Sequence, residues 1–407
     1  MSTIGKSMRN GMHKPGSALF TLFLSACLVV ALGTARAQET AAAAFQPEPL
    51  GNVLTLPTPY PSHWILALDS SFFHMMEGQV VVLDPLAETV SEQYKGMYTA
   101  SFMAATARSR KRNEHYVAET FYSRHGRGGE RTDLIAIYDP STLSVIAEVG
   151  IPPKRLGGIP KRIAMQLTND ENFALVYNFT PAQSVSVVDL EKRTFAGEID
   201  IPGCAFVIAT GDRGFTSICA NGALLTVRLN KDGSVRETKR SEPVISVDDD
   251  PVFEAYGQVG ETGYFPTFTG NVLPIKLSGK VAEPQASWSL VSDEERSAGW
   301  RPGGGIPVIA DATGELYVLM HPDGKDGTHK NGGGEVWVYN VKSKQRVRKI
   351  ELKNWGISLA MTGGEGRQIM TVVNADLGVD VYDAKSGSYL NSIAASMSTP
   401  FLIEGVN

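Results

Sequence analysis

The sequence predicts an all-β fold, a seven-bladed β-propeller of four-stranded antiparallel blades. Three observations lead to this prediction. Short segments of alternating apolar residues recur along the chain, turn-forming residues follow each of them, and amphipathic helical periodicity is nearly absent apart from 292–298. Recurrence at a period of about 40–50 residues is typical of propellers, in which each unit is one four-stranded blade.

Seven segments carry the repeat. They cover residues 80–84, 134–139, 185–189, 225–230, 272–278, 336–340 and 379–383. The Asp, Asn or Ser residues that end them, at positions 84, 139, 189, 230, 278, 340 and 383, lie 41 to 62 residues apart. Turn-forming runs such as Asp139–Thr142 and Asp383–Gly387 follow, because Asp side chains can bond the backbone two residues on and Gly accepts positive φ. Pro274 falls inside one segment, which favours an edge strand.

The ring is expected to close by pairing the two ends of the chain in one blade, and to bury apolar surface between neighbouring blades. Two sandwich domains are the alternative all-β arrangement. No linker or change of composition divides the chain, so a single propeller over residues 61–407 is favoured. Residues 38–60, rich in Ala and Pro, are expected to form a mobile N-terminal extension.

The first 37 residues have the pattern of a secretory signal peptide. Lys6, Arg9 and Lys14 precede an apolar run from about Ala18 to Leu32, and small residues then lead to a predicted cleavage after Ala37. This predicts export to an oxidising compartment such as the bacterial periplasm. A membrane anchor is disfavoured because the run is short for a bilayer core of about 30 Å. A lipid-attachment site at Cys27 is a further alternative.

Charge argues against nucleic acid as the partner. Removing the four positive charges of residues 1–37 changes the formal net charge from -5 to -9, whereas phosphate binding needs clustered positive charge. A basic stretch runs from Arg108 to Arg131, and a solvated surface loop is its simplest interpretation.

Two cysteines, Cys204 and Cys219, remain after cleavage. In an oxidising compartment such a pair most often forms one disulfide. Their spacing does not fit a zinc site.

No motif for a catalytic centre or a bound metal is found. The chain lacks a Gly-x-Ser-x-Gly elbow, a phosphate loop and a His-Glu-x-x-His pair. The run His321–His329 could be a metal loop, but a glycine-rich surface turn is favoured because no calcium-loop pattern accompanies it. The cluster at residues 72–76 is either core or an exposed apolar patch that marks an interface.

Four further motifs stand out: Gly129–Asp133 leading into Tyr138–Pro140, the pair Cys204 and Cys219, the run Gly299–Gly304, and the run His321–Lys330. Together they resemble the heavy (large) subunit of the quinoprotein amine dehydrogenases. The resemblance covers nearly the whole mature chain. The last run, with Ile218–Cys219 and Asp249–Pro251, is more similar to the aromatic amine (aralkylamine) branch, whereas Trp300–Pro302 is equally similar to the methylamine branch.

The resemblance implies a seven-bladed propeller in a periplasmic complex of two heavy and two light subunits. It implies that the cofactor, tryptophan tryptophylquinone, is carried by the small, disulfide-rich light subunit, so that this chain has no catalytic, cofactor-binding or metal-binding residue. The five tryptophans of this chain would then be unmodified. The implied reaction is oxidative deamination of primary amines, aromatic amines favoured, to an aldehyde and ammonia, with electrons passing to an azurin-like or amicyanin-like blue-copper protein.

The resemblance also implies a site role for this chain, as one wall of the substrate channel. The matching residues are Phe72 and Phe73, and which of the two lines the channel stays open. Three alternatives remain: a methylamine dehydrogenase heavy subunit, a periplasmic propeller that binds a ligand without redox chemistry, and a calcium-dependent propeller hydrolase or lactonase.

Overall fold

The computed structural model describes residues 55–406, except 76, 159, 365 and 394–396. The predicted signal peptide and residues 38–54 of the predicted extension lie outside the described residues. Leu56 and Tyr60, from the described end of that extension, contact the turn after strand β6 (Arg131–Asp139). The Leu56 N–H donates to the Ser141 carbonyl at 2.8 Å, and the Tyr60 hydroxyl donates to the Pro140 carbonyl at 2.6 Å.

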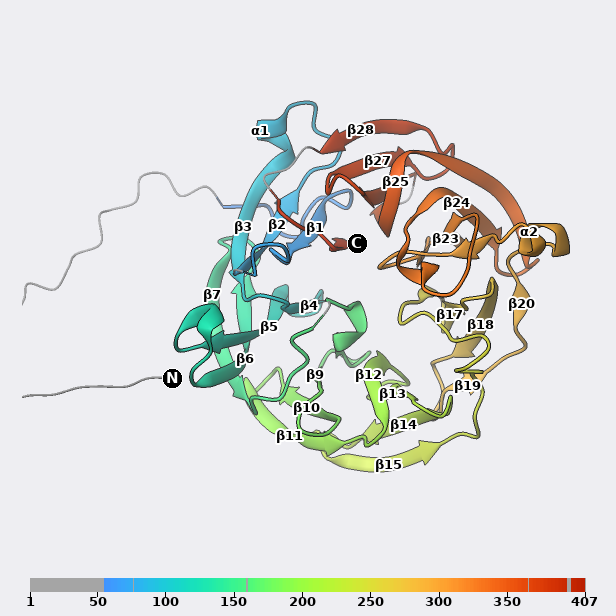
Figure 1. The fold of residues 1–407 in the computed structure, drawn as a ribbon. Coiled ribbons are helices and arrows are strands. Elements are labelled where there is room, and N and C mark those ends of the chain that lie inside the picture. The colour runs from blue at the N-terminus through green and yellow to red at the C-terminus, as the bar shows by residue number, and fades with distance from the viewer. Residues whose placement is uncertain (1–54, 76, 159, 365, 394–396, 407) are drawn as a thin grey trace, which may run out of the picture. The chain divides into compact units, whose positions relative to one another are not determined.

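Between Leu54 and Asn407, the described strands form antiparallel sheets that follow one another around a ring (Figure 1). One sheet is ordered β29 (Leu402–Gly405), β1 (Ile65–Asp69), β2 (Gly78–Leu83), β3 (Tyr94–Ala100), and the next is β4 (Ala105–Ser109), β5 (Glu114–Tyr122), β6, β7 (Ser144–Ile151). Two more are β8 (Met165–Leu167), β9 (Phe173–Asn178), β10 (Ser184–Asp189), β11 (Thr194–Asp200) and β12 (Cys204–Ala209), β13 (Gly214–Cys219), β14 (Leu224–Leu229), β15 (Val235–Arg240).

A fifth sheet is ordered β16 (Gly257–Val259), β17 (Thr262–Pro266), β18 (Asn271–Lys276), with β19 (Glu283–Pro284) and β20 (Trp288–Ser289) both paired to β18. The sixth contains β21 (Arg301–Pro302), β22 (Val308–Ala310), β23 (Glu315–His321), β24 (Gly333–Asn340), β25 (Gln345–Gly364), β26 (Arg367–Asn374), β27 (Val379–Asp383) and β28 (Tyr389–Ile393). The all-β propeller of four-stranded antiparallel blades is therefore confirmed.

The prediction of seven separate blades is wrong for the described residues, because five sheets stand alone and the sixth has eight strands. Strand β25 is the reason. Its first part pairs with β24 and its second part, from Gly356 to Gly364, pairs with β26, so the backbone passes from one group of strands to the next without leaving the sheet.

The ends of the described chain meet in one sheet, as predicted. Strand β29 pairs antiparallel with β1, with Leu66 opposite Glu404 and Leu68 opposite Leu402. Leu402 and Ile403 are 2% and 1% exposed, so this last strand buries apolar side chains as well as forming backbone hydrogen bonds. Burial of each such side chain stabilises a fold by roughly 1.5–3 kcal/mol.

The apolar core lies between neighbouring sheets, also as predicted. One cluster joins β1 and β2 to β26–β28, and another joins β5–β7 to β8–β10. A third joins β9–β11 to β12–β14 and to β17 and β18. Because each sheet supplies only one side of such a cluster, a single blade would expose it to water.

Two local predictions have different outcomes. The helical segment near Ser292 is confirmed as α2 (Asp293–Ser297), with a capping box between Ser292 and Glu295. The edge-strand prediction for Pro274 is wrong: β18 is an inner strand, and the outer strand is divided into β19 and β20 opposite Pro274, which has no N–H to donate.

The remaining helical segments are short. They are α1 (Val90–Gln93) and 3₁₀ turns at His125–Arg127, Arg162–Ala164 and Thr328–Lys330. Within the described residues, no helix is both long enough and apolar enough to cross a membrane.

Candidate functional site

The β1–β2 loop holds the two predicted channel residues at the surface. The side chains of Phe72 and Phe73 are 40% and 66% exposed, and Met75 is 70% exposed. The Phe72 ring meets the Phe73 ring edge-on at 5.4 Å between centroids and the Phe401 ring at 5.9 Å. Of the two interpretations of this cluster, the exposed apolar patch is the one that the structure supports.

Asp69, at the end of β1, holds this loop against the C-terminal segment. Its buried carboxylate accepts hydrogen bonds from the backbone N–H groups of Ser71 (3.1 Å), Ser398 (2.7 Å) and Thr399 (2.8 Å). The Thr399 hydroxyl then accepts from the Phe72 N–H at 2.8 Å. Hydrogen bonds to a charged acceptor are about twice as strong as neutral ones, so Asp69 fixes the position from which Phe72 projects.

A second loop, between β5 and β6, lies beside the first. The Nδ1 of His125 lies 3.7 Å from the Glu77 carboxylate, and a Cβ added to Gly126 would lie 3.9 Å from the Met75 carbonyl oxygen. Phe121 and Tyr122, at the end of β5, are 38% and 42% exposed. We call Phe72, Phe73, Met75, Phe121 and Tyr122 the aromatic patch. Exposed apolar side chains gathered on adjacent loops are typical of a surface that another molecule covers.

Ionisable groups are buried close to the patch. The Glu119 carboxylate, on β5, accepts the Ser101 N–H at 2.9 Å, and Glu119 is 3% exposed. Burial raises the pKa of Glu119 to about 7, although this N–H and the Arg155 guanidinium lower it. Arg155 is itself buried, and it donates to the Met103 carbonyl at 2.8 Å. Glu119 and Arg155 therefore hydrogen-bond Ser101 and Met103, in the segment between β3 and β4, and hold it in place.

The predicted disulfide is present. Cys204 and Cys219 are directly opposite each other on β12 and β13, and both are buried. They close a loop of 15 residues within one sheet, which makes the disulfide a local structural link.

The basic stretch from Arg108 to Arg131 is not one loop. Arg108 lies on β4, residues 110–112 lie in the β4–β5 turn, residues 124 and 127 lie in the β5–β6 loop, and Arg131 begins β6. Arg110, Lys111, Arg124 and Arg127 are exposed, as a solvated surface requires. Arg108 instead donates to the carbonyls of Gly405 and Val406, and Arg112 donates to the Glu171 carbonyl.

The His321–His329 run does not bring its histidines together as ligands. His321 ends β23 and is 2% exposed, and its Nδ1 lies 2.8 Å from the Pro322 carbonyl. His329 instead contacts the Phe268 ring edge-on at 6.1 Å. Across the described residues, no three His, Cys, Asp or Glu side chains are grouped so that they could hold a metal ion.

The tryptophans of this chain do not fit a resident quinone. Trp300 and Trp337 have the closest rings, 4.9 Å apart, but Trp337 is fully buried. The Trp337 indole N–H donates to Glu335, and the cations of Arg346 and Lys349 cover the ring at 4.3 and 4.0 Å. A redox group needs access to its substrate, which this packed ring lacks.

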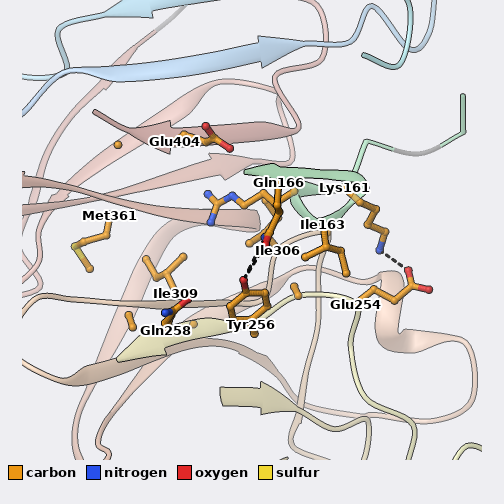
Figure 2. Close-up of a pocket in the computed structure, with 16 residues that line it drawn as sticks. Lys161, Ile163, Gln166, Glu254, Tyr256, Gln258, Ile306, Ile309, Met361 and Glu404 are labelled. Carbon is orange, nitrogen blue, oxygen red and sulfur yellow. Dashed lines mark hydrogen bonds and ion pairs between the residues drawn. The ribbon is translucent and has the colours of Figure 1, made fainter. Parts of the chain in front are cut away.

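A cavity of about 340 Å³ lies at the centre of the ring. Figure 2 shows side chains around it from β8, β16, β22, β25 and β29, and from the segments that lead into them. Gln166 donates to the Tyr256 hydroxyl at 3.2 Å, and Lys161 pairs with Glu254 at 2.9 Å. Sequence reasoning missed this site, because its residues come from distant segments and form no local motif.

The chain is similar in sequence to known proteins over most of its length. A family model described as methylamine dehydrogenase heavy chain matches residues 62–406. The methylamine dehydrogenase heavy chain of Methylorubrum extorquens is 29% identical over 281 residues, covering 68% of this chain and 67% of that protein. The heavy chain from Methylobacillus flagellatus is 28% identical over 320 residues, covering 75% of this chain and 78% of that protein.

Solved structures share the fold at low identity. The periplasmic gluconolactonase of Pseudomonas aeruginosa superposes with a TM-score of 0.56 at 13% identity, covering 84% of this chain and 99% of that one. A putative 6-phosphogluconolactonase from Bacteroides fragilis gives a TM-score of 0.54 at 10% identity, covering 88% and 99%. At such identities the similarity concerns the fold alone.

Proposed function

Because the chain belongs to the methylamine dehydrogenase heavy chain family, we propose that it is the heavy subunit of a periplasmic amine dehydrogenase. The observation that carries the proposal is the family match over residues 62–406. The partner is a light subunit in a complex of two heavy and two light chains. Export of this chain to the periplasm would use the predicted signal peptide at residues 1–37.

The redox cofactor of the proposed complex is tryptophan tryptophylquinone on the light subunit. When bound, it would take two electrons and two protons from a primary amine, and water would supply the oxygen of the aldehyde as ammonia is released. This chain contributes the aromatic patch, where Phe72 and Phe73 form one wall of the substrate channel. An apolar wall excludes water and accommodates the carbon skeleton of the amine. Electrons leave to an azurin-like or amicyanin-like blue-copper protein.

The same patch supports the proposed subunit contact. Phe73 and Met75 are more than half exposed on a loop that Asp69 holds in place. Aromatic side chains and Met are enriched at the centre of protein interfaces. A light chain seated over the patch would bury these side chains and close the channel on its second side.

We also propose that the eight-stranded sheet functions as two four-stranded units joined through β25. Residues 345–352 of β25 are then the outer strand of one blade, and residues 356–364 are the inner strand of the next.

Aromatic amines are the proposed substrates, and methylamine is the alternative that the relatives' names support. The test is co-expression with and without the neighbouring light-subunit gene, followed by amine-dependent dye reduction from methylamine to phenethylamine. Quinone absorbance and dye reduction should occur only when both chains are present. Activity from this chain alone, or a complex without amine oxidation, would reject the proposal.

A further inference from the structure

The central cavity contains a guanidinium and a carboxylate that make no ion pair with each other. Lys161 and Glu254 pair at 2.9 Å and neutralise each other. Arg162 and Glu404 also line the cavity, yet in the described part of the chain each lacks an ion pair. A charge removed from water is costly unless a group of opposite charge is close. Both groups are therefore available to a bound molecule.

Arg162 keeps unused donors. Its Nη2 donates to the carbonyls of Leu359, at 3.4 Å, and Ile403, while its Nε is buried without a hydrogen-bond partner among the described residues. Burial lowers the pKa of Arg162, and the charge of Glu404 opposes that shift. A planar guanidinium with free N–H groups is suited to a carboxylate.

Glu404 has cations on more than one side. Its carboxylate accepts no hydrogen bond from the described residues. Arg108, half-buried on β4, donates to the carbonyl of Gly405, at 3.2 Å, and to that of Val406. Burial lowers the pKa of Arg108, and the Glu404 charge raises it. Arg108 and Arg162 together carry one positive charge more than Glu404 balances, so a ligand needs an anionic group for Arg162. The Glu404 carboxylate, which accepts no hydrogen bond from the described residues, can still accept one from an N–H group of the ligand.

The rest of the lining has room for an apolar body. Ile163, Ile306, Ile309 and Met361 line the cavity, and its volume of about 340 Å³ is at the small end of the range for ligand pockets, about 300–1,000 Å³. Tyr256 adds a hydroxyl that remains protonated, because burial raises its pKa. Figure 2 shows Tyr256, Ile306, Met361 and Glu404 around the same space.

We propose that this central cavity binds a small zwitterion of the α-amino acid class, with its carboxylate on Arg162, its ammonium on Glu404 and an apolar side chain against Ile306 and Met361. One molecule of this class supplies an anion for Arg162 and N–H donors for the Glu404 carboxylate at a short fixed separation. The ligand contacts only this chain, so the proposal stands apart from the quinone subunit and from amine oxidation.

Ordered water is the competing occupant, because water also bridges buried polar groups. Calorimetric titration of the purified complex separates the two. The probes are L-phenylalanine and its desamino analogue 3-phenylpropionate, neither of which is a proposed substrate of the complex. We expect L-phenylalanine to bind at least about tenfold more tightly than 3-phenylpropionate. No heat from L-phenylalanine up to about 10 mM, or equal affinities for the two probes, would overturn the proposal.

Two variants assign the contacts. Glu404→Gln keeps the size of the side chain and should weaken L-phenylalanine about tenfold while leaving 3-phenylpropionate unchanged. The control is Glu283→Gln, an exposed carboxylate on β19, which should change neither affinity. Binding of L-phenylalanine that is insensitive to Glu404→Gln would overturn the assignment.

Arg162→Lys keeps the charge and removes the planar donor set, so it should weaken both carboxylate-bearing probes. If Arg162→Lys does not fold, Met361→Phe provides a second route, because a larger side chain on the wall should exclude L-phenylalanine without touching either charge. Unchanged affinity in the folded Met361→Phe protein would also overturn the proposal.

Discussion

The third strand of a blade in sheet order, such as β6 or β2, is connected differently at its two ends. At one end it joins the fourth strand through a short turn in which an acidic side chain bonds its own neighbours: Asp139 accepts the N–H groups of Ser141 and Thr142 at 2.7 and 3.1 Å. At the other end the third strand joins the second strand through a longer loop, such as 70–77 between β1 and β2. The Asp69 carboxylate holds that loop in place. That carboxylate accepts N–H groups 329 and 330 positions away.

This difference separates structure from function. The short turns satisfy their own hydrogen bonds and expose polar groups, so they offer little to a partner. The loops at the opposite end depend on distant segments, and they carry Phe72, Phe73 and Met75 into solvent. Binding residues are commonly found on loops that a rigid scaffold positions.

The largest expected effect is at Asp69. Asp69→Ala leaves the N–H groups of the half-buried Ser398 and the buried Thr399 without their acceptor, so the free energy of unfolding should fall by roughly 3 kcal/mol or more. Asp139→Ala, in the half-buried turn at the other end, should lower it by about 1 kcal/mol. Urea unfolding of both variants measures the difference. Equal losses would mean that the two ends are held equally firmly.

The disulfide should contribute almost as much. Replacing both Cys204 and Cys219 with Ala removes a link that closes 15 residues, which the chain-entropy model values at about 3 kcal/mol. Amine oxidation by the assembled complex should stay unchanged below the new melting temperature, because the link lies within one sheet. A loss of specific activity in fully folded protein would show that the link also shapes the site.

A pH-dependent contribution is expected from Glu119. The folded protein holds the Glu119 proton up to about pH 7, whereas the unfolded chain releases it near the model-compound value of 4.5. Between those values the unfolded state binds fewer protons, so the free energy of unfolding falls as pH rises, and the cost is then constant above about pH 7. Glu119→Gln does not titrate and should be more stable than wild type at pH 8 by about 1–3 kcal/mol.

Unfolding in urea at pH 5 and pH 8 measures this effect. At pH 5 the stability advantage of Glu119→Gln should be small, because the Glu119 carboxyl of the folded wild-type protein is then mostly protonated. The control is Glu283→Gln, which replaces an exposed carboxylate and should show no such change. A Glu119→Gln advantage of equal size at both pH values would assign the effect to packing.

The same contrast explains what could be predicted from sequence. The hairpin turns were predictable because Asp139 or Asp383 and the groups it bonds lie within three positions. The disulfide followed from an even count of cysteines. The eight-stranded sheet was not predictable, because a smooth passage through Gly356 changes no local pattern. The central cavity was missed for a related reason: Arg162 and Glu404 are far apart in sequence and meet only when the ring closes.

The smallest expected effect on stability is at the aromatic patch. Phe72→Ala and Phe73→Ala remove side chains that are 40% and 66% exposed, so each should change the free energy of unfolding by about 0.5 kcal/mol or less. In the assembled complex the same variants should shift the ratio of kcat/KM between methylamine and phenethylamine by about tenfold, because an apolar wall discriminates by roughly 1–3 kcal/mol. The control is Val90→Ala on α1, because Val90 is 65% exposed, nearly the same as Phe73. If both Phe variants keep the wild-type ratio, the loop is a scaffold like the turns at the other end. A shift from one variant alone would identify which phenylalanine faces the substrate.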